Sequence, residues 1–254
     1  MNKKIFTNII DVCSKQETVK REVLLNHDNN LWWPINITDY RMRLIIAGLS
    51  TRISYNMIHT YIKVISRLSS YRYEDIANMD KEQLISIMQK LGLTNNRYKY
   101  VQSMVNFINS KDEFFWKNQN DVLVLEIAKN VYGASYKVAQ CCVLYLKGYY
   151  CGVMPVDSGM KDVLLPCIGF EKKKGAIAHE ILRKQLENLV GGIDFKDIIY
   201  NNGFGQLDIE DYTNATWWVH LVLIYYKRYF CNKSVGRKCP LYVNSLCILC
   251  NCEK

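Results

Sequence analysis

Two short segments of the chain carry residue types that suit chemistry beside a phosphate backbone. Val131 to Ala139 is a glycine-containing turn that leads into an apolar helix and includes Lys137. Such a turn presents backbone N–H groups at a helix start, where they can bind a phosphate. Twenty residues after Lys137, Asp157 follows a rigid proline segment and precedes another helical run. The helix dipole and cap hydrogen bonds keep a carboxylate ionised at such a position, so Lys137 and Asp157 form a candidate reactive pair.

The cysteines are concentrated near the C-terminal end. Of the 10 cysteines, one group is separated by seven, seven, two and one residues and consists of Cys231, Cys239, Cys247, Cys250 and Cys252. A disulfide framework is not expected in an intracellular chain. Thiols at this density indicate a metal site, and four of them suit either zinc or a four-iron cluster.

The elements that must position these residues are helical. The chain has only 4 prolines, and its apolar residues recur at helical spacing. Residues 40–68 indicate two helices with a loop between them, and Asp80 is a candidate N-cap. Further helices are expected at 121–130, 136–147, 158–167, 175–190 and 213–230. The sequence therefore predicts an all-α fold.

Composition limits the function classes. The net charge of +9 suits a polyanionic partner, although solvated surface lysines account for it equally well. No signal-peptide apolar stretch follows the basic start. The longest strongly apolar stretch, 217–226, is about half of the roughly 20 residues that span a bilayer. We expect a soluble intracellular protein of the cytoplasm or nucleoid with no membrane partner.

The two reactive segments resemble the endonuclease III branch of the helix–hairpin–helix DNA glycosylases. The family's hairpin reads Leu-Pro-Gly-Val-Gly-Arg-Lys-Thr-Ala, and residues 133–139 match its Gly, Lys and Ala in register. The family's catalytic loop reads Val-Asp-Thr-His before a basic helix, and residues 156–159 read Val-Asp-Ser-Gly before Lys161. Residues 49–52 resemble its Leu-Ser-Ala-Gln loop, and the resemblance covers roughly residues 40–252.

The resemblance implies a reaction on a damaged base in DNA. Lys137 would attack the anomeric carbon and form a Schiff base, which requires an amine that is partly neutral. Asp157 would stabilise the positive charge that develops on the deoxyribose as the base leaves. Elimination would then nick the strand 3′ to the lesion. The expected enzyme is a DNA glycosylase with AP-lyase activity, and oxidised pyrimidines are the favoured substrate by analogy.

The resemblance also assigns residues to DNA binding. A base inside a duplex must be flipped out before it can be reached. The loops of Arg52 and Leu93 would fill the gap, and Gly133 and Ser135 of the hairpin would grip the backbone. Arg52 replaces the family's Gln, which would change the preference for the opposite base. Simple core packing is the alternative for Leu93.

The cysteine spacing departs from the family's intervals of six, two and five residues. Cys239 with the following proline resembles the third ligand, Cys247 the fourth and Cys231 the first. Cys250 then replaces the lost second ligand, with Cys252 as the spare. The expected cofactor is a structural 4Fe-4S cluster, and zinc is the alternative.

The resemblance implies a two-lobed, all-α helix–hairpin–helix glycosylase fold. A helical barrel lobe would span 40–150, and a cluster lobe would combine residues 1–39 with 151–254. The expected partner is double-stranded DNA with a damaged or mismatched base, bound by a monomer. Two other functions stay open. One is a monofunctional mismatch or adenine glycosylase in which Lys137 only contacts DNA, and the other is a non-enzymatic, zinc-containing DNA-binding protein.

Overall fold

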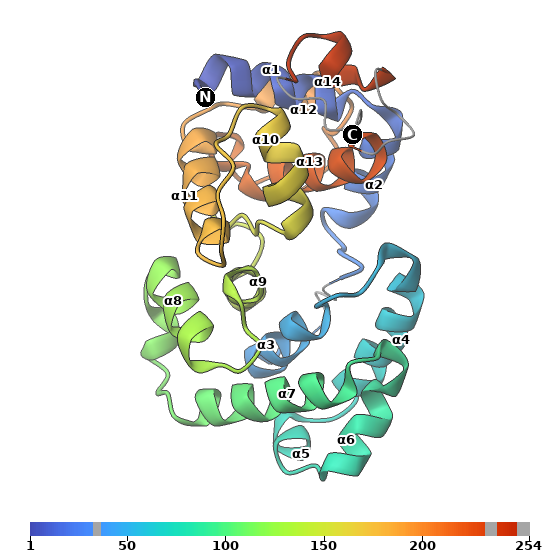
Figure 1. Cartoon of the computed structure of the whole chain (residues 1–254), viewed down its shortest axis with the longest axis vertical. Helices are drawn as coiled ribbons and strands as arrows, with labels where there is room; N and C mark the ends of the chain where they lie inside the picture. The colour runs from blue at the N-terminus through green and yellow to red at the C-terminus, as the bar shows by residue number, and fades with distance from the viewer. Residues whose placement is uncertain (33–36, 232–237, 248–254) are drawn as a thin grey trace. The chain divides into compact units, whose positions relative to one another are not determined.

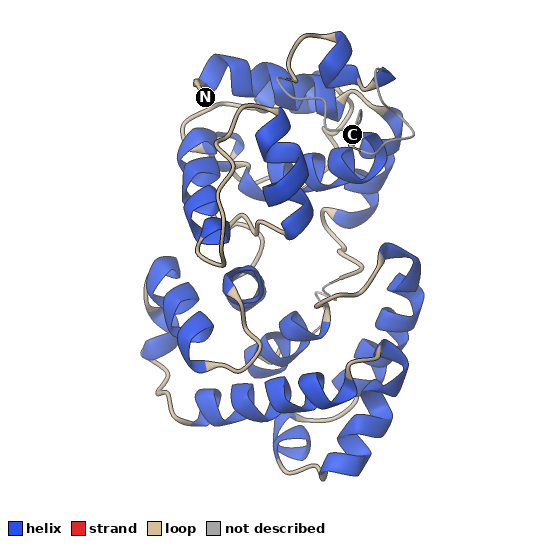
Figure 2. Ribbon diagram, viewed as in Figure 1, coloured by secondary structure: helices blue, strands red, loops and turns tan. Residues whose placement is uncertain are grey.

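The computed structural model describes residues 1–32, 37–231 and 238–247. Within these ranges the chain forms helices and loops and no β-strand (Figure 2). The predicted all-α class is therefore confirmed. None of the helices in these ranges combines the length and the apolar character needed to cross a membrane.

The chain divides into two compact units (Figure 1). The central unit is residues 29–148, and the discontinuous unit joins 1–28 to 149–254, whereas the sequence led us to expect boundaries after 39 and 150. The central unit contains α3 (Tyr40–Leu49), α4 (Ile58–Ser69), α5 (Tyr73–Ala77), α6 (Lys81–Met88), α7 (Thr94–Asn109), α8 (Asn120–Asn130) and α9 (Tyr136–Lys147). The discontinuous unit contains α1 (Lys3–Ser14), α2 (Glu17–Asn26), α10 (Leu165–Cys167), α11 (Ala178–Val190), α12 (Lys196–Asn201), α13 (Thr216–Phe230) and α14 (Pro240–Val243).

In the central unit, α3 packs against both α7 and α9, and α8 packs against α9 (Figure 1). The approach of α3 to α7 depends on Gly48, because a Cβ there would collide with the ring of Tyr100. The Tyr100 hydroxyl, buried by the same packing, donates a hydrogen bond of 2.6 Å to the Leu44 carbonyl. A buried hydroxyl needs such a partner, so this bond fixes α7 along α3.

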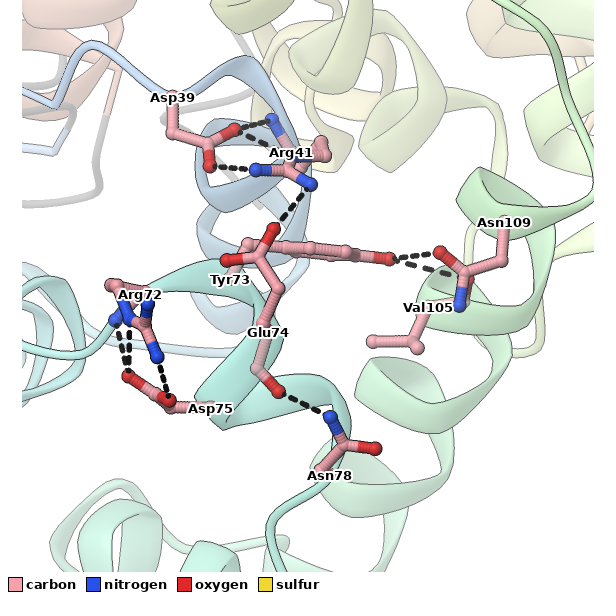
Figure 3. A network of polar contacts seen from close by, with 9 residues as sticks. All are labelled: Asp39, Arg41, Arg72, Tyr73, Glu74, Asp75, Asn78, Val105 and Asn109. Carbon is pink, nitrogen blue, oxygen red and sulfur yellow. Dashed lines mark hydrogen bonds and ion pairs between the residues drawn. The ribbon is translucent and has the colours of Figure 1, made fainter.

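A polar network fixes the start of α3 (Figure 3). Asp39 caps the helix by accepting the Arg41 N–H at 2.9 Å. The Arg41 guanidinium pairs with Asp39 and Glu74 at 2.8 Å each and lies 4.3 Å from the centroid of the Tyr73 ring. The Tyr73 hydroxyl in turn donates to Asn109 Oδ1 at 2.8 Å. Half-exposed ion pairs stabilise little, so the network mainly orients α3, α5 and α7.

The discontinuous unit is built around α13. Trp218 is fully buried and packs against the rings of Phe195 and Phe204. Both N-terminal helices, α1 and α2, pack against α13. The neighbouring Trp217 donates its indole N–H to the His27 carbonyl at 3.0 Å, which fixes the end of α2. Residues far apart in sequence therefore form one core.

Candidate functional site

The hairpin between α8 and α9 is residues 131–135. Gly133 turns the chain with φ of +75°, a conformation that glycine adopts without a steric cost. The Ala134 N–H bonds to the Val131 carbonyl at 3.1 Å. Ser103 of α7 accepts the Tyr132 N–H at 2.9 Å, so α7 holds the hairpin from outside. The helix bounds expected from the sequence, 121–130 and 136–147, agree with α8 and α9.

Lys137 is the second residue of α9 and is half-buried. Ser135 precedes the helix as its N-cap residue in an extended conformation. The first N–H groups of a helix have no acceptor within the helix, so this end of α9 can receive an anion. Burial raises the pKa of the Cys142 thiol on the same helix to about 12, and the Lys137 charge opposes that shift. The hairpin therefore brings Gly133, Ser135 and Lys137 together at one helix N-terminus.

The loops of Arg52 and Leu93 lie in the same unit. Arg52 follows the end of α3 with φ of 55°, and Leu93 precedes α7 with φ of 50°. Residues with a Cβ seldom adopt this left-handed conformation. Both side chains are exposed, and Leu93 has 45% of its surface accessible. The alternative of simple core packing for Leu93 is therefore wrong.

Asp157 lies in the discontinuous unit, at the start of a helical run from 158 to 167. Its carboxylate accepts the Met160 N–H at 2.6 Å, and its carbonyl accepts the Lys161 N–H at 2.9 Å. Asp157 thus caps the helix and is half-buried. The run continues as a π-helical turn over Met160–Leu164, a rare form that is frequent at functional sites.

Helix α11 holds the segment that leads to Asp157. Glu187 accepts the Met154 N–H at 2.9 Å, and His179 Nδ1 lies 2.6 Å from the Val156 carbonyl, to which it can donate. Burial raises the pKa of Glu187, and its pairing with Arg183 at 2.8 Å opposes that shift. Two side chains of α11 therefore bind the backbone of the segment that leads to Asp157.

The end of the Lys227 side chain lies beside Gly159. A Cβ on Gly159 would collide with it. Lys227 comes from the last turn of α13. A cation therefore lies over the first turn of the helix that Asp157 caps, although residue 159 has no side chain.

The three described C-terminal cysteines flank α13 and α14. Cys231 follows α13, Cys239 precedes α14, and Cys247 follows α14. Cys239 Sγ lies 3.1 Å from the Tyr226 hydroxyl. Burial, followed by the charges of Cys231 and Cys239, raises the pKa of Cys13 on α1.

The cysteines provide the donor atoms that a cluster needs, but the described ones are not grouped as cluster ligands. Thiols suit both an iron–sulfur cluster and zinc. In the part of the chain that the structure describes, no three His, Cys, Asp or Glu side chains are grouped as a metal site requires. The expected ligand Cys250 and the spare Cys252 lie outside the described residues.

Comparison with known proteins adds no relative. No family model matches the sequence, and no curated protein or solved structure is significantly similar to the chain.

Sequence reasoning missed several of the residues that hold this site. No sequence pattern linked His179 to the site, and it holds the Asp157 segment. Lys227 lies 68 residues from Gly159, so only the fold brings them together. Arg97, by contrast, left a signal. It shares the apolar face of α7 with Val101, Met104 and Ile108, where an arginine requires buried acceptors.

Proposed function

We propose that this protein is a DNA glycosylase with AP-lyase activity and the two-lobed helix–hairpin–helix fold. The observation that carries the proposal is the position of Lys137. It lies on the first turn of α9, directly after a glycine hairpin that α7 holds in place. A DNA phosphate bound at this helix start would bring the strand next to the lysine amine.

The chemistry divides between the two residues. The Lys137 amine attacks C1′ of the flipped nucleotide, and the base leaves with the electrons of the glycosidic bond and takes up a proton. Asp157, fixed by its cap hydrogen bond, stabilises the positive charge on the sugar ring as that bond breaks. The opened sugar and Lys137 form a Schiff base. Loss of a C2′ proton then expels the 3′ phosphate and nicks the strand.

The start of α9 places Lys137 where the helix macrodipole supplies positive charge. Its side chain is half-buried, and the neutral amine is the form that attacks C1′.

We further propose that the C-terminal cysteines hold a structural 4Fe-4S cluster, with Cys231, Cys239, Cys247 and Cys250 as ligands. The proposal is supported by the suitability of thiols as cluster ligands and by the density of cysteines in this part of the sequence. The cluster would fix the segment after α13 against the phosphates of double-stranded DNA and take no part in bond cleavage. The positive net charge of +9 is consistent with that partner.

Borohydride trapping on a duplex with an abasic site tests the proposal. Reduction captures a Schiff base as a stable protein–DNA adduct, which we expect for the wild type and not for Lys137→Ala. Lys129→Ala is the matched control, because Lys129 is an exposed lysine at the end of α8 beside the same hairpin. It should keep the adduct.

Each alternative function has its own outcome when the trapping is paired with base release from a duplex that still carries a damaged or mismatched base. Folded wild type that removes a base without forming an adduct would be a monofunctional glycosylase that uses water. Protein that binds DNA, contains zinc and removes no base would be the non-enzymatic DNA-binding protein. Either result overturns the role of Lys137 as nucleophile.

A further inference from the structure

Arg97, near the start of α7, is buried, with 4% of its surface exposed. Within the described residues its guanidinium makes four hydrogen bonds, all to backbone carbonyls. Two go to the segment before α7, to Gly92 at 2.9 Å and Leu91 at 3.3 Å. Two go to the end of α3 and the residues that follow it, to Leu49 and to Thr51 at 3.0 Å. One side chain therefore connects two loops that lie about forty residues apart in sequence.

The acceptors of Arg97 include the residues directly before the two exposed loop tips. Thr51 precedes Arg52, and Gly92 precedes Leu93. Both tips are in the left-handed conformation, with φ of 55° and 50°. For residues with a Cβ this conformation is strained, and it persists only where the surroundings enforce it.

Residue 97 must carry several hydrogen-bond donors held in one rigid plane, as an arginine guanidinium does. Burial lowers the pKa of the Arg97 guanidinium below its ordinary value, and its partners are neutral carbonyls that give it no countercharge. A buried charge of this kind is not primarily stabilising, so its value lies in geometry. Arginine projects its donors in fixed directions from one plane, whereas a lysine ammonium is a single point with rotatable donors.

We propose that Arg97 is a positioning residue that locks the Arg52 and Leu93 loops into one rigid two-pronged probe, which enters the duplex where the target base leaves the stack. This inference rests on the proposed function and deepens it. The probe opens double-stranded DNA, and Lys137 performs the covalent step. The two tasks should therefore be separable by mutation.

Single-stranded DNA distinguishes the opening of the duplex from the covalent step, because a single strand has no complementary strand to open and needs no probe. We expect Arg97→Lys to lower the rate of borohydride trapping on a duplex abasic site about 100-fold, the usual scale for a displacement of about 1 Å. Trapping on the same site in a single strand should be unchanged. Fluorescence of 2-aminopurine opposite the abasic site should show the same loss of duplex opening.

Arg43→Lys is the matched control. Arg43 lies in the same unit and also donates to backbone carbonyls, those of Ile37 and Tyr145, away from both loops. It should keep the duplex rate. Hydrogen–deuterium exchange of residues 49–54 and 91–94 should increase in Arg97→Lys and not in the control. Equal loss on duplex and single strand, or unchanged exchange, would overturn the positioning role.

A double-mutant cycle on Arg52→Ala and Leu93→Ala tests the rigid probe even when Arg97 variants do not fold. Two tips of one probe should show non-additive losses on duplex DNA, while additive losses would reject the probe. Failure of the proposed function has a different signature. The wild type would then trap neither single-stranded nor duplex sites, and the exchange experiment would still report on the loops.

Discussion

Replacing Asp157 separates its two roles, because it caps a helix and provides a negative charge. Its carboxylate accepts the Met160 N–H at 2.6 Å. Asp157→Asn keeps a side-chain oxygen for that bond, so we expect stability close to that of the wild type. Asp157→Ala removes the cap and should cost about 1 kcal/mol, which lowers the Tm by about 2–4 °C in a chain of this size.

The expected losses of activity do not follow the losses of stability, because both variants should lose activity equally. Both variants lack the charge that the proposed mechanism places against the developing cation, so both should slow base release by about 10²–10³-fold, the effect of removing one electrostatic stabiliser. The assay is single-turnover release of an oxidised pyrimidine from a duplex, paired with thermal unfolding. Asp162→Asn, on the same helical run, is the control and should keep the wild-type rate. Wild-type activity in Asp157→Asn would refute the charge argument.

Three further predictions concern the rest of the molecule. Gly133→Ala should cost about 1–2 kcal/mol in chemical unfolding, because its φ of +75° strains any residue with a Cβ although nothing lies within 4 Å; a much larger loss would contradict the open hairpin. Burial lowers the pKa of His27 from its ordinary 6.5, against the opposing effects of Asp28 and Asp208, so the unfolded state binds more protons. The free energy of unfolding should therefore fall as the pH drops below 6.5, and a pH dependence equally steep in His27→Gln would contradict this. The proposed cluster predicts iron and visible absorbance in the purified wild type and the loss of both in Cys239→Ser, and a variant that keeps both would exclude this ligand.

The helices could be predicted from the sequence because their determinants are local. Asp80 caps α6 through the Gln83 N–H at 2.8 Å, as its position before a helical run predicted. The interruption in residues 40–68 is the loop between α3 and α4. Caps and helical periodicity act within a few residues, so one sequence suffices to find them. Only the structure shows which helices pack against one another.

The supports of the candidate site could not be predicted, because they are long-range contacts between side chains and backbone. Nothing near Val156 indicates that His179 approaches its carbonyl. An arginine on an apolar helix face indicates buried acceptors, but not that they belong to two different loops. Backbone carbonyls are present at every residue, so a sequence pattern cannot select among them.

The surroundings of Gly159 show how a distant helix enters a local motif. Gly159 leaves room for the end of the Lys227 side chain, because a Cβ at residue 159 would lie against it. Any larger residue at 159 would have to displace that flexible side chain. The positive charge beside this turn comes from the last turn of α13, so no pattern within residues 156–159 could have indicated it.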